Sequence, residues 1–272
     1  MLLILFSFFF QVNKTDLQKN GLQGNVKSAK ETTYKAIGKP GGKTTKGQKG
    51  TEAGKQDLYL FFDTEKKLTE KIKMNAAGKP VYKYEYKYDP QGKLISETVY
   101  NSDNKVFNSG LFKYDSATKE ESRYDENKTL FSKFFYHYDT NGNLTEELRH
   151  GADGVVKTKN NYTYDANGNK TEDQGFNADG TFVFKNTFTN DSKGLPVEIR
   201  AYTDEQTFGK KLCKYDDHQN LVEELEYRTS GDLVQKTTFS YKYDPQGNWT
   251  EKIKFVNNVP TFLTERAIEY YP

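Results

Sequence analysis

Apolar and polar residues alternate along most of this chain with the two-residue period of β-strands. Residues 83–88 read Lys-Tyr-Glu-Tyr-Lys-Tyr, and residues 136–138 and 162–164 place a polar residue between two tyrosines in the same way. Successive side chains of a strand point to opposite faces of a sheet. The pattern therefore predicts strands of about seven to nine residues with one apolar face and one charged face.

The alternation repeats along the chain. An aspartate that follows an aromatic or similar residue marks each copy: Asp63, Asp89, Asp115, Asp139, Asp165, Asp191, Asp216 and Asp244. These markers lie 26, 26, 24, 26, 26, 25 and 28 residues apart. A fixed interval of this length is typical of an array of supersecondary units.

Two turns are predicted in each copy. With the marker aspartate as position 0, glycine recurs at +3 and again at +15, in most cases after an Asx residue three places earlier. Asp89-Pro90-Gln91-Gly92 and Asn177-Ala178-Asp179-Gly180 are examples. Asx opens a type I turn and glycine accepts the left-handed conformation that closes a three-residue hairpin loop. Each copy therefore reads as a unit of β-hairpins.

The hairpin geometry predicts the register of the strands. If position 0 pairs with +4, then −1 pairs with +5 and −3 with +7, so all odd positions share one face. Position −1 is aromatic except at Asn190, and positions −3, +5 and +11 are mostly aromatic or aliphatic. The even positions are mostly Lys, Glu, Thr and Asn. We expect the odd positions to form the core.

About eight copies give about 17 or 18 strands, and open sheets of more than about ten strands rarely stay flat. The sequence therefore predicts an all-β fold of tandem β-hairpin repeats that form a curled or spiral antiparallel meander sheet. A wide barrel is the alternative.

The array is predicted to cover residues 21–272 as a single domain. Residues 1–20 are predicted to be an export signal and linker, because the apolar stretch from Leu2 to Phe10 is too short to span a membrane. A buried first strand and a gene-start artefact are the alternatives. Residues 38–55 are rich in glycine and lysine and lack an apolar pattern, which indicates a mobile insertion.

Composition restricts the function. The net charge is +2, from 40 basic and 38 acidic residues. This balance argues against a nucleic-acid-binding protein, which would need a clear excess of basic residues. Aromatic residues make up 15% of the chain although its mean hydropathy is −0.92, which suits a sheet with one dry face. Cys213 is the only cysteine and occupies the −3 position, where it substitutes for a core aromatic. No catalytic or metal-binding motif is present, so we expect a protein without enzymatic activity, cofactor or metal.

A row of glutamates at +7 is the most unusual feature of the repeat. By the predicted parity it lies on the apolar face, where dry burial of carboxylates would be very costly without hydrogen bonds. The row could be structural, line a wet interior or bind a cation or polar ligand. Tyr136 and Tyr162 would lie opposite Glu146 and Glu172. The row comprises Glu70, Glu146, Glu172, Glu198, Glu223 and Glu251, of which Glu146, Glu172 and Glu198 are candidate ligand-binding residues.

The copies at 83–94, 136–144 and 162–169 resemble the YD repeat of the Rhs family, whose motif is roughly Tyr-x-Tyr-Asp-x-x-Gly-Asn/Arg-Leu. The resemblance recurs from about residue 58 to the end of the chain, with degenerate copies at Asp191 and Asp216. It implies a spiral shell of β-hairpins with carbohydrate-binding or adhesive activity. Rhs toxins carry Asp-Pro-x-Gly-Leu before a toxin domain, whereas Asn248 follows Asp244-Pro245-Gln246-Gly247 here, so no toxin domain is expected.

These observations predict an exported, non-enzymatic binding or adhesion module that is secreted, periplasmic or at the cell surface, with glycan as the first ligand to test. A structural shell, or an immunity or accessory partner of an Rhs-type system, is the alternative. No transmembrane span is expected, and the oligomeric state stays open. Aromatics that break the alternation are candidate stacking platforms for a glycan: Phe107, Phe135 and Phe182.

Overall fold

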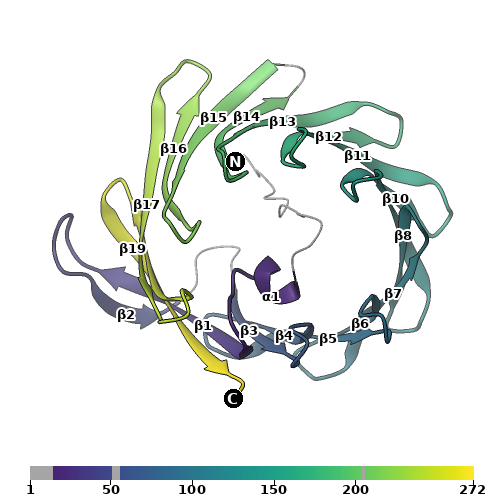
Figure 1. Ribbon diagram of the computed structural model, residues 1–272, viewed down its shortest axis with the longest axis horizontal. Coiled ribbons are helices and arrows are strands. Elements are labelled where there is room, and N and C mark those ends of the chain that lie inside the picture. Colours follow the sequence, from purple (N-terminus) through teal and green to yellow (C-terminus); the bar gives the residue numbers. More distant parts are fainter. Residues whose placement is uncertain (1–14, 51–55, 204–205) are drawn as a thin grey trace. The chain divides into compact units, whose positions relative to one another are not determined.

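The computed structural model describes residues 15–50, 56–203 and 206–272 of the chain, so the predicted export signal from Leu2 to Phe10 lies outside the described residues. The described part is all-β apart from one short helix, and its strands form antiparallel hairpins (Figure 1). The predicted antiparallel meander of hairpins is confirmed. The elements are α1 (Asp16–Lys19), β1 (Val26–Ile37), β2 (Thr45–Lys49), β3 (Asp57–Phe62), β4 (Leu68–Met74), β5 (Pro80–Tyr88), β6 (Leu94–Tyr100), β7 (Val106–Tyr114), β8 (Thr118–Asp125), β9 (Leu130–Tyr138), β10 (Leu144–Gly151), β11 (Val156–Tyr164), β12 (Lys170–Asn177), β13 (Phe182–Asn190), β14 (Pro196–Thr203), β15 (Gln206–Tyr215), β16 (Leu221–Arg228), β17 (Leu233–Tyr243), β18 (Trp249–Val256) and β19 (Val259–Tyr270).

The strands fall into two compact units. Among the described residues, the first unit comprises 112–123 and 130–235, and the second comprises 15–111, 124–129 and 236–272. In the first unit the strands from β9 to β16 pair in chain order. In the second unit β3 to β7 pair in chain order, and β1 pairs with both β3 and β19. The first and last strands of the described chain are therefore hydrogen-bonded to each other.

Most hairpin loops have the predicted three-residue geometry. The N–H of Asp89 donates to the carbonyl of Lys93, and the N–H of Gly92 donates back to the carbonyl of Asp89, both at 2.9 Å. The Asp89 carboxylate accepts the N–H groups of Gln91 and Lys93 at 3.0 and 2.8 Å. Gly92 has a φ of 81°, in the left-handed region that glycine adopts without strain. The aspartate and the glycine of the repeat are thus the two residues that form the loop.

A β-bulge follows these loops. Tyr88 pairs with Leu94 as predicted, but the next pair joins Lys87 to Ser96, so Ile95 is an extra residue on β6. The same shift occurs between −1/+5 and −2/+7 in six other hairpins. Since a bulge sets two residues opposite one, it reverses the alternation of the side chains that follow. Position +7 therefore shares a face with −2, and +8 shares a face with −3.

A second bulge restores the original parity in the next strand. Met74 pairs with Pro80 and Lys73 with Tyr82, which leaves Val81 as the extra residue of β5. We call the face that carries positions −1, −3, +5, +8 and +10 the tyrosine face. The opposite face, with positions −2, −4, +7, +9 and +11, is called the ion-pair face.

The aromatic residues at +11 were expected in the core, and this prediction is wrong because of the bulge. They lie on the ion-pair face, where lysines of the preceding strand cover their rings. The ammonium group of Lys83 lies 4.5 Å from the ring centre of Tyr100, and that of Lys185 lies 5.2 Å from the ring centre of Tyr202. These contacts combine the apolar lysine stem with a cation–π attraction.

Hydroxyl groups of the −1 tyrosines connect neighbouring hairpins on the tyrosine face. Tyr164 donates to the carbonyl of Leu144 at 2.8 Å, and Tyr88 lies at the same distance from the carbonyl of Leu68. The hydroxyl of Tyr215 makes the equivalent bond to the carbonyl of Pro196 at 3.0 Å. Asn190, which replaces the aromatic residue in its copy, donates its side-chain amide to the carbonyl of Lys170 at 3.0 Å. Tyrosine and asparagine both supply a donor at this position, whereas Phe62 in the first copy has none.

Part of the predicted mobile insertion forms a strand. β2 pairs with the end of β1, with Ile37 opposite Thr45 and Ala36 opposite Lys46. Lys46 also forms an ion pair with Glu265 of β19 at 2.7 Å. The strand could not be recognised in residues 38–55, because its residues are mostly exposed and polar and show no apolar alternation. Residues 51–55 lie outside the described residues.

Replacing Tyr164 with Phe should lower the melting temperature by about 2–4 °C, because the Leu144 carbonyl loses its donor at a cost of about 1 kcal/mol. Tyr227→Phe is the matched control, since the Tyr227 side chain lies on the ion-pair face beneath Lys210. Thermal unfolding followed by circular dichroism measures both. Equal melting temperatures for the two variants would contradict the proposed role of the hydroxyl.

Candidate functional site

The tyrosine face carries charged groups that the sequence analysis had not placed there. The hydroxyl of Tyr136 donates to Glu121 at 2.9 Å, and that of Tyr162 donates to Glu147 at 3.3 Å. Burial raises the pKa of Glu147, while the Tyr162 hydrogen bond and nearby Lys119 oppose the shift. The carboxylates that face these tyrosines thus come from +8 in the copy of Asp139 and from +6 in the 24-residue copy of Asp115.

The predicted position of the +7 glutamates is wrong. Glu146, Glu172 and Glu198 lie on the ion-pair face, because the bulge displaces them from the tyrosine face by one residue. Glu146 forms an ion pair with Lys159, Lys185 lies 3.5 Å from Glu172, and Arg200 lies 2.5 Å from Glu198. Tyr136 and Tyr162 consequently donate to Glu121 and Glu147 rather than to Glu146 and Glu172. These pairs support the structural interpretation of the row, although half-exposed ion pairs stabilise a fold little.

The three candidate phenylalanines are not brought together into one site. Phe135 lies edge-on to the ring of His150 at 5.0 Å, and Phe182 lies 6.1 Å from the ring of Phe176. Strands β10, β11 and β12 separate Phe135 from Phe182 in the pairing order. Phe107 is 45% exposed and lies 5.4 Å from the ring of Tyr82 in the second unit. Binding by these residues stays a prediction.

A hollow of about 490 Å³ lies beside the β7–β8 loop in the first unit. This loop is one residue shorter than the loops at the other marker aspartates, since the N–H of Asp115 donates to the carbonyl of Thr118 at +3 rather than to a carbonyl at +4. Tyr114 lines the hollow and is 38% exposed, whereas the other −1 tyrosines are half-buried. Asp115, Ser116, Asp139 and Thr140 supply the polar groups around it.

The position of Tyr114 at −1 predicts a core residue, which its exposure contradicts. Two signals marked this copy as different. The interval from Asp115 to Asp139 is 24 residues rather than 26, and the copy has Thr118 where most others have glycine at +3. In other copies a leucine after the loop pairs with the −1 tyrosine, as Leu94 does with Tyr88 and Leu144 with Tyr138. The copy with the shorter loop has no such leucine.

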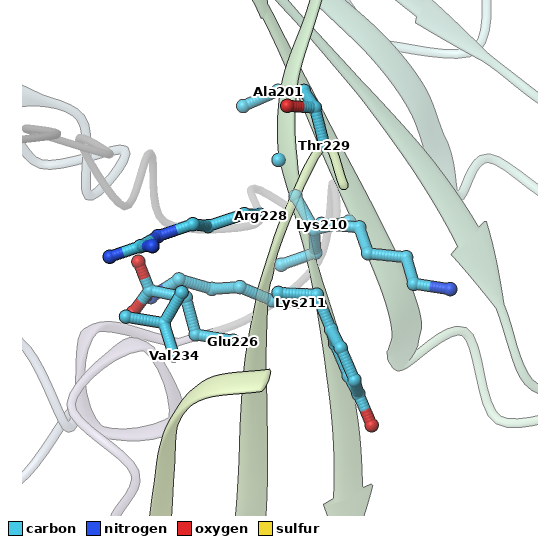
Figure 2. A pocket seen from close by; sticks show the side chains of 10 residues that line it. Ala201, Lys210, Lys211, Glu226, Arg228, Thr229 and Val234 are labelled. Carbon is cyan, nitrogen blue, oxygen red and sulfur yellow. The ribbon is translucent and has the colours of Figure 1, made fainter. Parts of the chain in front are cut away.

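A second hollow of about 370 Å³ lies over β14, β15 and β16. Its floor consists of Ile199 and Ala201, which are 5% and 6% exposed, and of buried Gly209. Figure 2 shows Lys211, Glu226, Arg228 and Val234 gathered on one side of the strands. Lys210 points to the other side.

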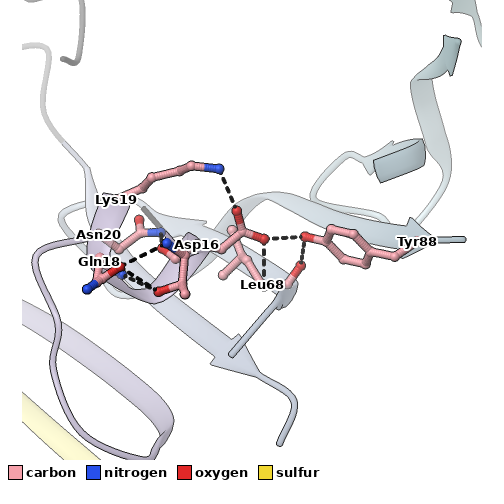
Figure 3. A network of polar contacts seen from close by, with 7 residues as sticks. Asp16, Gln18, Lys19, Asn20, Leu68 and Tyr88 are labelled. Atoms are coloured by element: carbon pink, nitrogen blue, oxygen red, sulfur yellow. Dashed lines mark hydrogen bonds and ion pairs between the residues drawn. The ribbon is translucent and has the colours of Figure 1, made fainter. Parts of the chain in front are cut away.

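Helix α1 covers part of the tyrosine face in the second unit. Leu17, Leu22 and Val26 pack with Leu60 and Phe62 of β3 in a buried cluster. The Asp16 carboxylate lies 2.8 Å from the hydroxyl of Tyr88 and accepts the N–H of Leu68 at 3.3 Å (Figure 3). Burial and Asp16 together raise the pKa of Tyr88, which keeps that hydroxyl a donor.

The remaining candidate groups show no catalytic arrangement. Cys213 is 6% exposed, and burial raises the pKa of its thiol to about 11, so it is protonated at neutral pH. No group of three or more His, Cys, Asp or Glu residues within the described ranges could hold a metal ion. Among the same residues, no helix is long and apolar enough to cross a membrane.

Comparison with known proteins gives structural similarities alone, since no protein family and no curated protein matches the chain. A porin-like protein from Bacteroides uniformis is 11% identical, with a TM-score of 0.48 over 91% of this chain and 99% of that chain. A porin-like protein from Bacteroides vulgatus is 10% identical, with a TM-score of 0.23 over 91% and 98% of the two chains. The structure of TcdB2-TccC3-TEV is 10% identical with a TM-score of 0.21, and the match covers 82% of this chain but only 16% of that one.

The raised pKa of Glu147 predicts a pH dependence of stability. The folded protein holds this proton more tightly than the unfolded chain, so stability falls as pH rises from the ordinary value of 4.5 through the raised one. Glu147→Gln removes the charge and still accepts the Tyr162 hydroxyl. We expect it to raise the melting temperature at pH 8 and to have less effect at pH 4.5.

Glu146→Gln is the control, because the adjacent residue lies on the opposite face beside Lys159. It should not raise the melting temperature at pH 8. A gain at pH 8 from Glu146→Gln, with none from Glu147→Gln, would contradict the assignment of the two faces.

Proposed function

We propose that this chain is an extracellular or periplasmic binding module without catalytic activity, and that it binds carbohydrate through the hollow beside Tyr114. The exposed ring of Tyr114 carries the proposal, because burial at the equivalent positions makes the other ladder tyrosines unsuitable. The apolar stretch from Leu2 to Phe10, read as an export signal, supports the location.

The composition of the hollow suits a sugar ring. An exposed aromatic ring offers an apolar face with a polar edge, which can pack against the C–H face of a pyranose. The Asp115 carboxylate accepts the N–H of Ser116 at 2.6 Å and has further lone pairs directed to solvent. The hydroxyls of Ser116 and Thr140 can donate to or accept from sugar hydroxyls. A volume of about 490 Å³ falls in the range of small-molecule sites.

Asp139, one of the two carboxylates of the hollow, is unsuited to serve as the acid of a glycosidase. Asp139 is held by its own loop, since its Oδ1 accepts the N–H groups of Asn141 and Asn143 and its Oδ2 accepts the side-chain amide of Asn143. These hydrogen bonds lower the pKa of Asp139. A glycosidase needs one carboxyl with a raised pKa to protonate the leaving group. Asp139 therefore cannot act as that acid near neutral pH.

A glycan array probed with the full-length protein tests the proposal, followed by titration of the strongest ligand. Tyr114→Ala should weaken that ligand by about tenfold or more, equivalent to about 1.4 kcal/mol, with little change in melting temperature. Tyr114→Phe should retain most of the affinity, since the ring is kept. Phe135→Ala provides the comparison with the site predicted from sequence.

Two results would overturn this assignment. The first is an array without any bound glycan. The second is a Tyr114→Ala variant with wild-type affinity, and a loss confined to Phe135→Ala would instead support the stacking platform predicted from the sequence.

A structural shell or accessory role is the second candidate. The tyrosine face favours it, because its polar groups bond to one another: Lys170 and Asp173 are 2.7 Å apart and their side chains are 6% and 5% exposed. Asn186 also donates to Asp173 at 2.8 Å. Such internally satisfied rows order a large sheet without any ligand. This role would be favoured if the array showed no bound glycan and the protein were isolated from its native source in a stable complex.

A further inference from the structure

The hollow over β14, β15 and β16 arises from an uncompensated pair of small residues. On the tyrosine face, each +10 residue lies opposite a residue of the next strand, and in the other described pairs at least one partner has a side chain larger than that of alanine. Gly175 faces Phe184, whose ring occupies the space that a side chain at Gly175 would fill. Ala201 instead faces Gly209, so both partners are small. The other described pairs are Lys73 with Tyr82, Val99 with Asn108, Arg149 with Thr158 and Lys254 with Phe262.

The glycine cannot be exchanged for a residue that fills the space. A Cβ atom at Gly209 would come within 2.7 Å of the carbonyl oxygen of Tyr227, closer than backbone geometry tolerates. The strand pairing that places Gly209 opposite Arg228 therefore fixes the glycine and keeps the floor open. The space persists as a consequence of the register rather than of a loop conformation.

The rim of the hollow is cationic. Lys211 lies 2.9 Å from Glu224 and 3.9 Å from Glu226, so its charge is already shared between two carboxylates. Arg228 is exposed, and its guanidinium makes no ion pair or side-chain hydrogen bond with the described residues. Figure 2 shows its side chain on the same side of the strands as Glu226 and Val234. Arg228 is thus the group at this rim that can accept a new anionic partner.

We propose that this hollow binds a short aliphatic monocarboxylate, whose chain lies on Ile199, Ala201 and Gly209 and whose carboxylate pairs with Arg228. A guanidinium binds a carboxylate through two parallel hydrogen bonds, and the apolar floor excludes water from the chain. Glu226 lies two residues from Arg228 on the same face, so it disfavours a dianion such as a phosphate monoester. This site lies apart from the Tyr114 hollow and does not depend on carbohydrate binding.

Titration of full-length protein with hexanoate, followed by the methyl resonances of Ile199 and Ala201, tests the proposal. Wild type should show saturable shifts. Arg228→Gln should weaken hexanoate at least about tenfold, whereas Lys210→Gln, on the other side of the strands, should leave it unchanged. Hexanol should bind wild type and Arg228→Gln equally, because it has no carboxylate.

Ala201→Leu should fill the floor and abolish binding, and circular dichroism must show that the variant remains folded. If it unfolds, the comparison of Arg228→Gln with Lys210→Gln still decides. The proposal is overturned by non-saturable shifts in wild type, by equal affinities of those two variants, or by hexyl phosphate binding more tightly than hexanoate. Tyr114→Ala should bind hexanoate as wild type does, which separates this site from the carbohydrate proposal.

Discussion

A β-bulge directly after the hairpin loops determines which side chains of this sheet share a face. It moves the +7 glutamates to the ion-pair face and brings the +8 residues opposite the tyrosines. In three copies a threonine at the extra position supports the bulge: Thr69, Thr145 and Thr250 donate to the carbonyl of the −2 residue at 3.1, 3.2 and 3.4 Å. The tyrosine–carboxylate bonds, the surface ion pairs and the hollow at Gly209 all follow from this shift.

The bulge also explains how a chain of low mean hydropathy folds. A half-buried polar group is tolerated when it is hydrogen-bonded, and the net gain from each such bond is about 1 kcal/mol. On the tyrosine face, phenol groups donate to backbone carbonyls of the preceding hairpin and to carboxylates such as Glu121 and Glu147. The aromatic rings therefore supply apolar area while their hydroxyls satisfy the polar groups beside them.

The loops, the strands and the antiparallel meander could be predicted from sequence because they depend on local chemistry. Aspartate at 0 and glycine at +3 form the loop by themselves, as Asp89 and Gly92 show. The parity beyond +5 could not be predicted, because the extra residue is β-branched, as Thr145 and Ile95 show, and β-branched residues are equally typical of ordinary strand positions. Both hollows depend on departures from the repeat: a shortened loop at Asp115 and the small pair of Ala201 and Gly209.

Engineered disulfides test the bulged register most directly, because a disulfide forms only when both Cβ atoms are close and point the same way. In a Cys213→Ala background, Thr163→Cys with Glu172→Cys joins residues that pair directly on the ion-pair face. Tyr162→Cys with Glu172→Cys joins the residues that an unbulged hairpin would pair. The bulged register predicts rapid oxidation of the first pair and a free thiol content near two for the second. Efficient oxidation of the second pair alone would contradict it.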